Sequence, residues 1–347
     1  MNVLQEGLEI ARGYFIRVEY TKGNLLMEGW LLLPNKKFDN YQIFIDKQYV
    51  CDTEVIANEG VAAGYPYISH ARYSYFNIEL NRSKEEMSKL IVISVVGMAK
   101  GEQTAKIETC FFHEASVDII DTPIHLMRRV ASTDNTPYFR ASRFKTYYDY
   151  FTLLSMYLDI KSIKKLLDWG CGCGRTTSVF HKLTNIPEID GCDVDAEAIE
   201  WCKKNISNVN FSVISVDPPT AYPDNSFDLV IGQSVLTHLT KNMQLVWLKE
   251  MKRILKPGGL LLASVHGEFA AYFCLPETWK EILKQGIYDE MLDSTLDGIT
   301  PVGYYRGTLQ SQEYTRKVFS TYFEILEYKE RGSSNHQDIV VMKKRLN

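Results

Sequence analysis

A glycine-rich turn, set between an apolar run and a helical pattern, constrains the fold of this chain more than any other stretch. The apolar run Ile163 to Leu167 ends in the acidic residue Asp168, and a helical pattern resumes from Thr176 to Leu183. Between them three glycines stand at alternate positions, namely Gly170, Gly172 and Gly174. This order predicts a buried strand, a tight turn and a helix whose N-terminus faces the turn. Glycines there would let a ligand lie directly against the main chain.

The spacing of the glycines separates two classes of nucleotide cofactor. A dinucleotide site has the pattern G-x-G-x-x-G, and its third glycine would replace Arg175 here. Asp168 would also be poorly placed beside two phosphates, but it suits a cationic ligand that carries an ammonium or a sulfonium. A second acidic residue, Asp193, closes the next apolar segment, where a carboxylate can reach the hydroxyls of a ribose.

From Lys164 onward, short apolar runs alternate with helical patterns, which is typical of a parallel sheet covered by helices. We expect a helix capped by Asp195 and an amphipathic helix over Lys241 to Leu255. The expected strands are Val209 to Ser215, Phe227 to Gly232, Leu260 to Val265, Phe323 to Tyr328 and Asp338 to Met342.

These motifs resemble the class I S-adenosylmethionine (SAM) methyltransferases. Asp168-Trp169-Gly170-Cys171-Gly172-Cys173-Gly174 is similar to their first motif. Phe227-Asp228-Leu229-Val230 and Leu255-Lys256-Pro257-Gly258-Gly259 resemble the region between their fourth and fifth strands. The resemblance implies an α/β fold: a Rossmann-like, doubly wound, seven-stranded sheet with an antiparallel last hairpin. We assign it to residues 136–347.

The same resemblance implies SAM as the cofactor and a set of cofactor-binding residues. Asp168 would face the positive end of SAM, hold the glycine turn, or do both. Asp193 would bind the ribose, and Asp217 would lie near the adenine. The full set is Asp168, Gly170, Cys171, Gly172, Gly174, Asp193, Val194, Asp217 and Gln233.

Two histidines are candidates for a general base, which a poorly nucleophilic hydroxyl needs. His238 follows the fourth strand and His266 follows the fifth, so both border the crevice at the carboxyl ends of the strands. We favour His266 slightly, because Glu268 could orient its ring, although either histidine could be structural. His336 is expected to serve the turn of the last hairpin.

A long insert, Glu268 to Gln312, separates the fifth strand from the last hairpin. Its run Tyr304, Tyr305 and Arg306 could bind the acceptor by stacking, hydrogen bonding or pairing with an anion. The alternative is that the insert merely covers the edge of the sheet.

The first part of the chain has a different character. Short β-rich runs separated by polar turns predict an all-β sandwich-like accessory domain over residues 1–115, followed by a linker over 116–135. Aromatic residues such as Trp30, Tyr67 and Tyr73 could bind carbohydrate. We favour the alternative that they fill a core or cover a dimer interface, which would make the domain a route to a homo-oligomer.

Composition limits the remaining classes. The chain has 347 residues and a net charge of -4, which gives no general attraction to nucleic acid or to an anionic membrane. No apolar run approaches the roughly 20 residues of a membrane span, and the start lacks the layout of a secretion signal. Seven scattered cysteines without C-x2-C spacing predict no metal site and a reducing cytoplasm.

The sequence therefore predicts a SAM-dependent methyltransferase that O-methylates a sugar, a glycan or another small hydroxylated acceptor. One alternative is an N-methyltransferase of an amino sugar or a small amine. The other is a non-catalytic protein that binds SAM or a glycan.

Overall fold

The computed structural model describes residues 11–113, 121–271 and 276–346 of the chain. The chain divides into two compact units. The first unit comprises residues 1–119 and 135–148, and the second comprises 120–134 and 149–347. Helix α4 (Thr136–Leu154) contributes residues to both. Among the described residues, no helix has the length and the apolar character that a bilayer crossing needs.

The first unit contains two four-stranded antiparallel sheets and a short helix, α2 (Glu59–Gly64). One sheet has the order β1-β2-β6-β5 and the other the order β4-β3-β7-β8. The strands are β1 (Arg12–Thr21), β2 (Asn24–Leu32), β3 (Asn40–Ile45), β4 (Gln48–Glu54), β5 (Ile56–Ala57), β6 (Tyr73–Asn81), β7 (Ile91–Ala99) and β8 (Glu102–Phe111).

Side chains from the two sheets of the first unit meet in its interior. The fully buried ring of Tyr41, on β3, lies 5.7 Å from that of Phe76, on β6, and its hydroxyl donates to the carbonyl oxygen of Leu31. These contacts support the expected sandwich. Among the aromatic residues named above, Trp30 is buried, as a core residue would be, whereas Tyr67 and Tyr73 are exposed.

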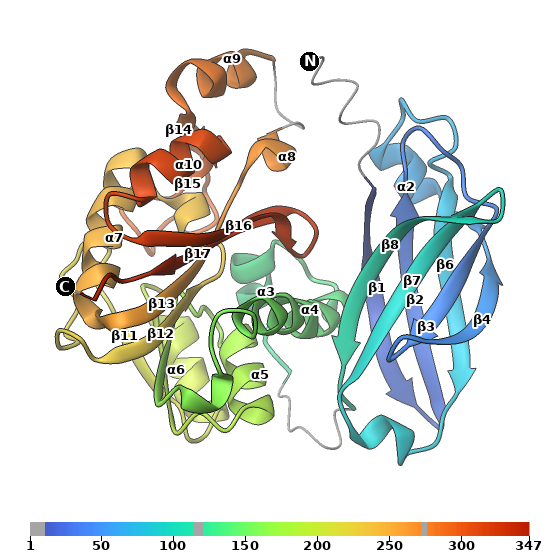
Figure 1. Ribbon diagram of the computed structural model, residues 1–347, viewed down its shortest axis with the longest axis horizontal. Helices are drawn as coiled ribbons and strands as arrows, with labels where there is room; N and C mark the ends of the chain where they lie inside the picture. Colours follow the sequence, from blue (N-terminus) through green and yellow to red (C-terminus); the bar gives the residue numbers. More distant parts are fainter. Residues whose placement is uncertain (1–10, 114–120, 272–275, 347) are drawn as a thin grey trace. The chain divides into compact units, whose positions relative to one another are not determined.

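The second unit is built on a seven-stranded sheet of order β11-β10-β9-β12-β13-β17-β16 (Figure 1). Five neighbouring strands run parallel, while β17 is antiparallel to β13 and β16 is antiparallel to β17. The strands are β9 (Lys165–Trp169), β10 (Glu188–Asp193), β11 (Asn210–Val213), β12 (Phe227–Gly232), β13 (Leu255–Val265), β16 (Glu324–Ser333) and β17 (Gln337–Lys343). The predicted Rossmann-like sheet with an antiparallel last hairpin is confirmed.

Helices and a small hairpin surround this sheet. Helix α3 lies within the stretch that the sequence predicts to be a connection. The helices are α3 (Ile124–Ala131), α5 (Arg175–Leu183), α6 (Ala196–Asn205), α7 (Lys241–Ile254), α8 (Glu268–Ala271), α9 (Pro276–Gln285) and α10 (Gln312–Phe319). The insert adds a separate two-stranded antiparallel sheet, β14 (Ile287–Leu292) and β15 (Arg306–Gln310).

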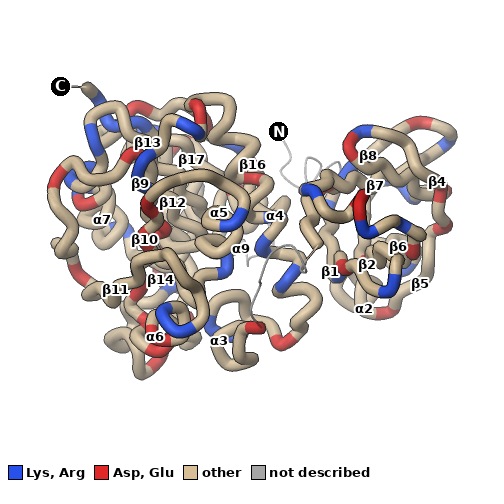
Figure 2. The backbone as a smooth tube through the Cα atoms, turned by 90° about the horizontal axis from the view of Figure 1, so that it is seen from below, with Lys and Arg blue, Asp and Glu red and all other residues tan. Residues whose placement is uncertain are grey.

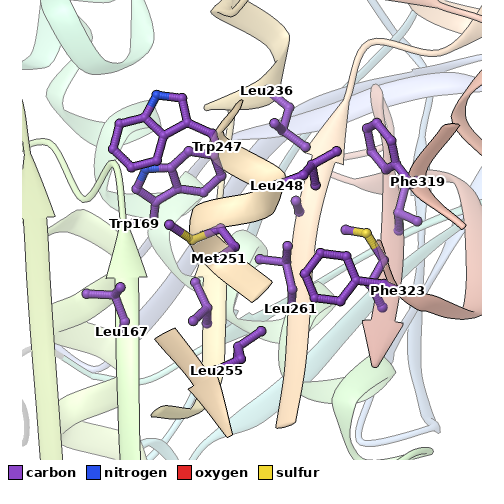
Figure 3. Packing of buried hydrophobic residues seen from close by; sticks show 14 of the residues in the cluster. Leu167, Trp169, Leu236, Trp247, Leu248, Met251, Leu255, Leu261, Phe319 and Phe323 are labelled. Carbon is purple, nitrogen blue, oxygen red and sulfur yellow. The ribbon is translucent and has the colours of Figure 1, made fainter. Parts of the chain in front are cut away.

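The main core of the second unit lies between α7 and the sheet (Figure 3). The indole rings of Trp169 and Trp247 are 5.1 Å apart, and Leu248 and Leu261 are fully buried beside them. Burying each such aliphatic side chain contributes about 1.5–3 kcal/mol. This packing fixes the carboxyl ends of β9, β12 and β13, where the candidate functional residues lie.

Candidate active site

The glycine turn after β9 is shaped by positive φ angles and by close packing. Gly170 and Gly172 have φ angles of +73° and +52°. A Cβ atom on Gly170 would lie 2.3 Å from a methyl carbon of Val235, and one on Gly172 would lie 2.7 Å from a methyl carbon of Val130. Any larger residue would therefore push the turn away from its neighbours. The amides of Gly170 and Cys171 both donate to the carbonyl oxygen of Cys192, which ties the turn to β10.

Asp193 ends β10 and faces the turn. One carboxylate oxygen accepts from the amide of Gly172 at 2.7 Å, and the other accepts from the amide of Asp195 at 2.9 Å. Asp195 itself caps α6 as predicted, by accepting from the amides of Glu197 and Ala198. Burial raises the pKa of Asp193. The hydrogen bonds from the backbone amides of Asp195, Gly172 and Val194 oppose this effect.

Asp168 is a buried carboxylate at the carboxyl end of β9. It is 1% exposed, and the hydroxyl of Thr177 donates to it at 2.5 Å. The pKa of Asp168 is raised to about 6, mainly by burial and also by the charge of Asp193, while the hydrogen bond from Thr177 and the charge of Arg175 oppose this effect. An ionised carboxylate in this position is costly unless a cation lies beside it.

These features fit a positively charged nucleoside cofactor such as SAM. Asp168 lacks the full compensation that a cationic group would give, and Asp193 keeps a lone pair for a ribose hydroxyl. Asp217 lies exposed in the loop after β11, and Gln233 follows β12 directly. The amide of Gln233 donates to the side-chain oxygen of Gln337 at 3.2 Å. The residues at this edge of the sheet would thus hold the cofactor along β9, β10 and β12.

The two candidate base histidines lie next to each other at the ends of β12 and β13. Their ring centroids are 6.2 Å apart. Nδ1 of His238 lies 2.9 Å from the carbonyl oxygen of Arg306, and Nε2 of His266 lies 3.3 Å from the amide nitrogen of Gln337. Burial lowers the pKa of both rings, that of His266 to about 3. Burial therefore favours the neutral form of both imidazoles.

The third histidine, His336, also lies in this group. Its ring is 5.8 Å from that of His266, and burial lowers its pKa. Within the described parts of the chain, no group of three or more His, Cys, Asp and Glu residues is arranged to hold a metal ion.

The insert brings its three predicted substrate residues to different places. The hydroxyl of Tyr304 donates to the carbonyl oxygen of Val216, which precedes Asp217. The ring of Tyr305 stacks on that of His238, with centroids 4.0 Å apart and planes 10° from parallel. The guanidinium of Arg306 donates to the carbonyl oxygen of Gly303 at 2.6 Å. Tyr305 is thus the member of this run that lies beside a candidate base.

Two residues of the site were missed by sequence reasoning. Asp293, in the insert, has a carboxylate oxygen 3.5 Å from Nδ1 of His238. Gln337, at the start of β17, connects His266 to Gln233 and Ser234. The one signal in the sequence for Asp293 is that it is an acidic residue in the insert expected to bind the acceptor. Asp293 has no fixed spacing from His238 that would link the two residues.

Charged residues of both signs are interspersed along the backbone of each unit (Figure 2). The carboxylate of Asp293 raises the pKa of both His238 and His266 and so opposes the effect of their burial.

Comparisons with known proteins agree with this architecture. Residues 167–263 match a family model described as "Methyltransferase domain". Probable methyltransferase ltbC of Aspergillus luteorubrus is 33% identical over 113 residues, which are 29% of this chain and 40% of that protein. The tRNA N(3)-cytidine methyltransferase METTL2 of Gallus gallus is 30% identical over 115 residues, which are 30% of this chain and 31% of that protein.

A solved structure is also similar to part of this chain. The PH0226 protein from Pyrococcus horikoshii OT3 has a TM-score of 0.44 and 22% identity, and covers 61% of this chain and 93% of that one. The matches to ltbC and METTL2 span two fifths or less of those relatives, so they concern the domain and not the whole protein. Over residues 167–263 the chain therefore carries a methyltransferase enzyme domain, and the cofactor of this domain is S-adenosylmethionine.

Proposed function

We propose that this protein transfers a methyl group from SAM to a hydroxyl group of a sugar or of another small hydroxylated acceptor. The observation that supports the proposal best is the pair of imidazoles, His238 and His266, whose rings lie 6.2 Å apart at the carboxyl ends of β12 and β13. A neutral imidazole can accept the proton of a hydroxyl group, and the amide and hydroxyl groups of Gln337 and Ser234 suit uncharged polar acceptors.

When bound, SAM supplies an electrophilic methyl group, whose bond to sulfur breaks with the electron pair left on sulfur as the acceptor oxygen bonds to the methyl carbon. The residues of the chain have two tasks in this reaction. Asp168 and Asp193 would bind and orient the cofactor, since alignment supplies much of the rate of a displacement. A histidine at the end of β12 or β13 would remove the proton from the acceptor hydroxyl.

N-methylation of an amino sugar or of a small amine is the alternative reaction. Asp293 favours it in one respect, because its carboxylate could bind an ammonium group beside the histidines. An amine that is already deprotonated needs less help from a base, so this reaction would depend less on His238 and His266. A protein that binds SAM or a glycan without catalysis is the alternative from another class.

The role of the first unit is also a proposal. We assign its sandwich to acceptor docking or to self-association, and exposed rings such as those of Tyr67 and Tyr73 could serve either role.

The test is a labelling screen with the full-length protein. Methyl-labelled SAM is incubated with separate pools of nucleotide sugars, glycolipids, small amines and total RNA, and labelled products are identified by mass spectrometry. We expect an O-methylated product in a hydroxylated pool. Asp193→Ala is the control, because loss of cofactor binding must abolish labelling. Label in amines or RNA alone, or no label from protein that binds SAM, would overturn the proposal.

A further inference from the structure

We propose that His238, rather than His266, is the catalytic base, and that Asp293 is a positioning residue that forms a carboxylate–imidazole pair with it. This inference rests on the proposed O-methyl transfer. It adds a residue of the insert to the machinery of the reaction and gives the two histidines different roles.

The contacts of His238 determine which ring nitrogen carries its hydrogen. Nδ1 lies 2.9 Å from the carbonyl oxygen of Arg306 and 3.5 Å from a carboxylate oxygen of Asp293. Both neighbours accept hydrogen bonds and neither can donate one, so Nδ1 carries the hydrogen and donates it. Nε2 of the neutral ring is left with a lone pair that can take a proton.

The insert also fixes the plane of the His238 ring. Tyr305 stacks on one face of it at 4.0 Å. The hydroxyl of Thr308 donates to the carbonyl oxygen of Leu239, which anchors the segment that follows the histidine to β15. Asp293 is held in turn by the amide of Thr295, which donates to its second oxygen at 2.9 Å. The imidazole is thus oriented by neighbours that are themselves held in place.

His266 lacks this arrangement. Gln337 faces its Nε2 with an amide nitrogen, a donor, so the lone pair of Nε2 accepts that hydrogen bond. The ring also makes a hydrogen bond to the backbone of Thr308. Both hydrogen-bonding sites of the neutral ring are therefore in use. Of these two rings, within the part of the chain that the structure describes, it is His238 that has a carboxylate oxygen 3.5 Å from a ring nitrogen.

The groups around His238 stabilise the charge that a base acquires. Asp293, His266 and Tyr305 are its titratable neighbours, and Asp293 is the carboxylate among them. Burial lowers the pKa of His238, and the charge of Asp293 opposes this. During the reaction the proton leaves the acceptor oxygen, is held on Nε2 as an imidazolium opposite Asp293, and passes to solvent after the product leaves.

The first experiment does not require an acceptor. Nitrogen-15 spectra of the histidine rings in the full-length protein, assigned with His238→Gln and His266→Gln, report the tautomer and the pKa of each ring. We expect hydrogen on Nδ1 of His238, and a pKa for His238 that falls in Asp293→Asn and is unchanged in Asp297→Asn. Asp297 is an exposed carboxylate of the same loop and serves as the matched control. Hydrogen on Nε2 of His238, or an equal response to both substitutions, would overturn the pairing.

The second experiment uses an acceptor identified by the labelling screen. We expect His238→Gln to lower kcat by about 10²- to 10⁴-fold and Asp293→Asn by roughly tenfold or more, with the KM for SAM unchanged. The acid limb of the pH profile should move to lower pH in Asp293→Asn. An Asp293→Asn profile that coincides with that of Asp297→Asn, or a greater loss in His266→Gln than in His238→Gln, would overturn the assignment.

Failure of this inference can be told apart from failure of the proposed function. If no hydroxylated acceptor is methylated but the ring spectra show the expected tautomer and response to Asp293→Asn, the proposed reaction is wrong and the pairing stands. If O-methylation occurs and the spectra do not show the pairing, the inference is wrong and the function stands. Calorimetric SAM binding by each variant verifies that the domain is folded.

Discussion

Replacing Asp168 with asparagine should stabilise the folded protein without cofactor and weaken its binding of SAM. The carboxylate of Asp168 is 1% exposed, and burial raises its pKa from the ordinary 3.8 to about 6. A carboxyl group whose pKa is higher in the folded protein than in the unfolded chain destabilises the fold at every pH at which it is ionised. Its contribution is thus most favourable below about pH 3.8, and stability is lost as the pH rises through about 6.

The size of the effect follows from the two pKa values. Each tenfold change in the protonation equilibrium is worth about 1.4 kcal/mol, so ionised Asp168 lowers the free energy of unfolding by about 3 kcal/mol at pH 7.5. About half of this loss is already present at pH 5. Asparagine removes it and keeps an oxygen to accept from Thr177, but its amide group needs a partner, at a cost of about 1–3 kcal/mol if it finds none. We expect a net gain of up to about 2 kcal/mol at pH 7.5.

Urea denaturation, followed by the fluorescence of Trp169 and Trp247, measures this gain. The quantity to compare is the difference in stability between Asp168→Asn and the unaltered protein at pH 5 and at pH 7.5. Asp338, whose pKa burial also raises to about 6, is present in both proteins and cancels in this difference. The advantage of the variant should grow by about 1.4 kcal/mol between the two pH values.

Calorimetry of SAM binding completes the test. A cation beside Asp168 favours its ionised form, so the affinity of the unaltered protein should fall as the pH drops below about 6. The variant should bind at least tenfold more weakly at pH 7.5, with a flatter pH dependence. A variant that is less stable at pH 7.5, or a stability difference that does not vary with pH, would refute the argument that burial of this charge is only partly compensated without cofactor.

Three further substitutions test the packing of the second unit. Gly267→Ala should lower the free energy of unfolding by about 2–4 kcal/mol in urea titrations, because its Cβ would lie 1.7 Å from a carboxylate oxygen of Asp338. The control is Gly64→Ala, which has open space around its Cβ and should change the free energy of unfolding little. Leu248→Ala should cost about 2–5 kcal/mol in the same assay by leaving a cavity beneath α7, and a loss below 1 kcal/mol would contradict the described core. Tyr304→Phe should weaken SAM binding several-fold in calorimetry, since the loop before Asp217 loses its bond to the Tyr304 hydroxyl, and unchanged affinity would separate that loop from the cofactor.

The parallel part of the sheet could be predicted because its strands are buried on both faces and read as apolar runs. The boundary of β13 could not. Pro257, Gly258 and Gly259 suggest a turn before a strand that begins at Leu260, yet β13 begins at Leu255. Leu255 already pairs with Phe227, and the register shifts before the next pair, Leu229 with Leu260. The Pro-Gly-Gly sequence therefore forms an irregularity within the strand.

Strand β4 was not predicted for a different reason. It is an edge strand whose side chains are largely exposed, so it lacks the apolar alternation that marks its partner β3. The turn that joins the two strands places Asp46 and Lys47 at positive φ, where Asn-Gly would be the usual signal. Local sequence carries little information about an edge strand with this turn.

The site divides along a similar line. Asp168 and the glycine turn lie at the end of β9, and Asp193 lies at the end of the neighbouring strand β10. The topology of the sheet therefore brings them together. The pairing of Asp293 with His238 depends on how the insert folds back across the sheet edge. The carboxylate of Asp293 and the carbonyl group of Arg306, which both face Nδ1 of His238, come from two separate segments of that insert. No spacing in the sequence encodes that contact, so it is a product of tertiary structure alone.

The role of Asp193 shows why a single substitution at this site needs care. A carboxylate offers about four lone-pair positions, and the amides of Gly172 and Asp195 use one on each oxygen. The backbone hydrogen bond from Val194 takes a further position, and the remaining one can accept from a ribose hydroxyl, so holding the turn and binding the ribose are compatible. Asp193→Ala removes both contributions and would weaken SAM binding even if the carboxylate never touched the ribose. A SAM analogue that lacks one ribose hydroxyl separates them: if Asp193 binds the ribose, the analogue should lose affinity for the unaltered protein and much less for Asp193→Ala.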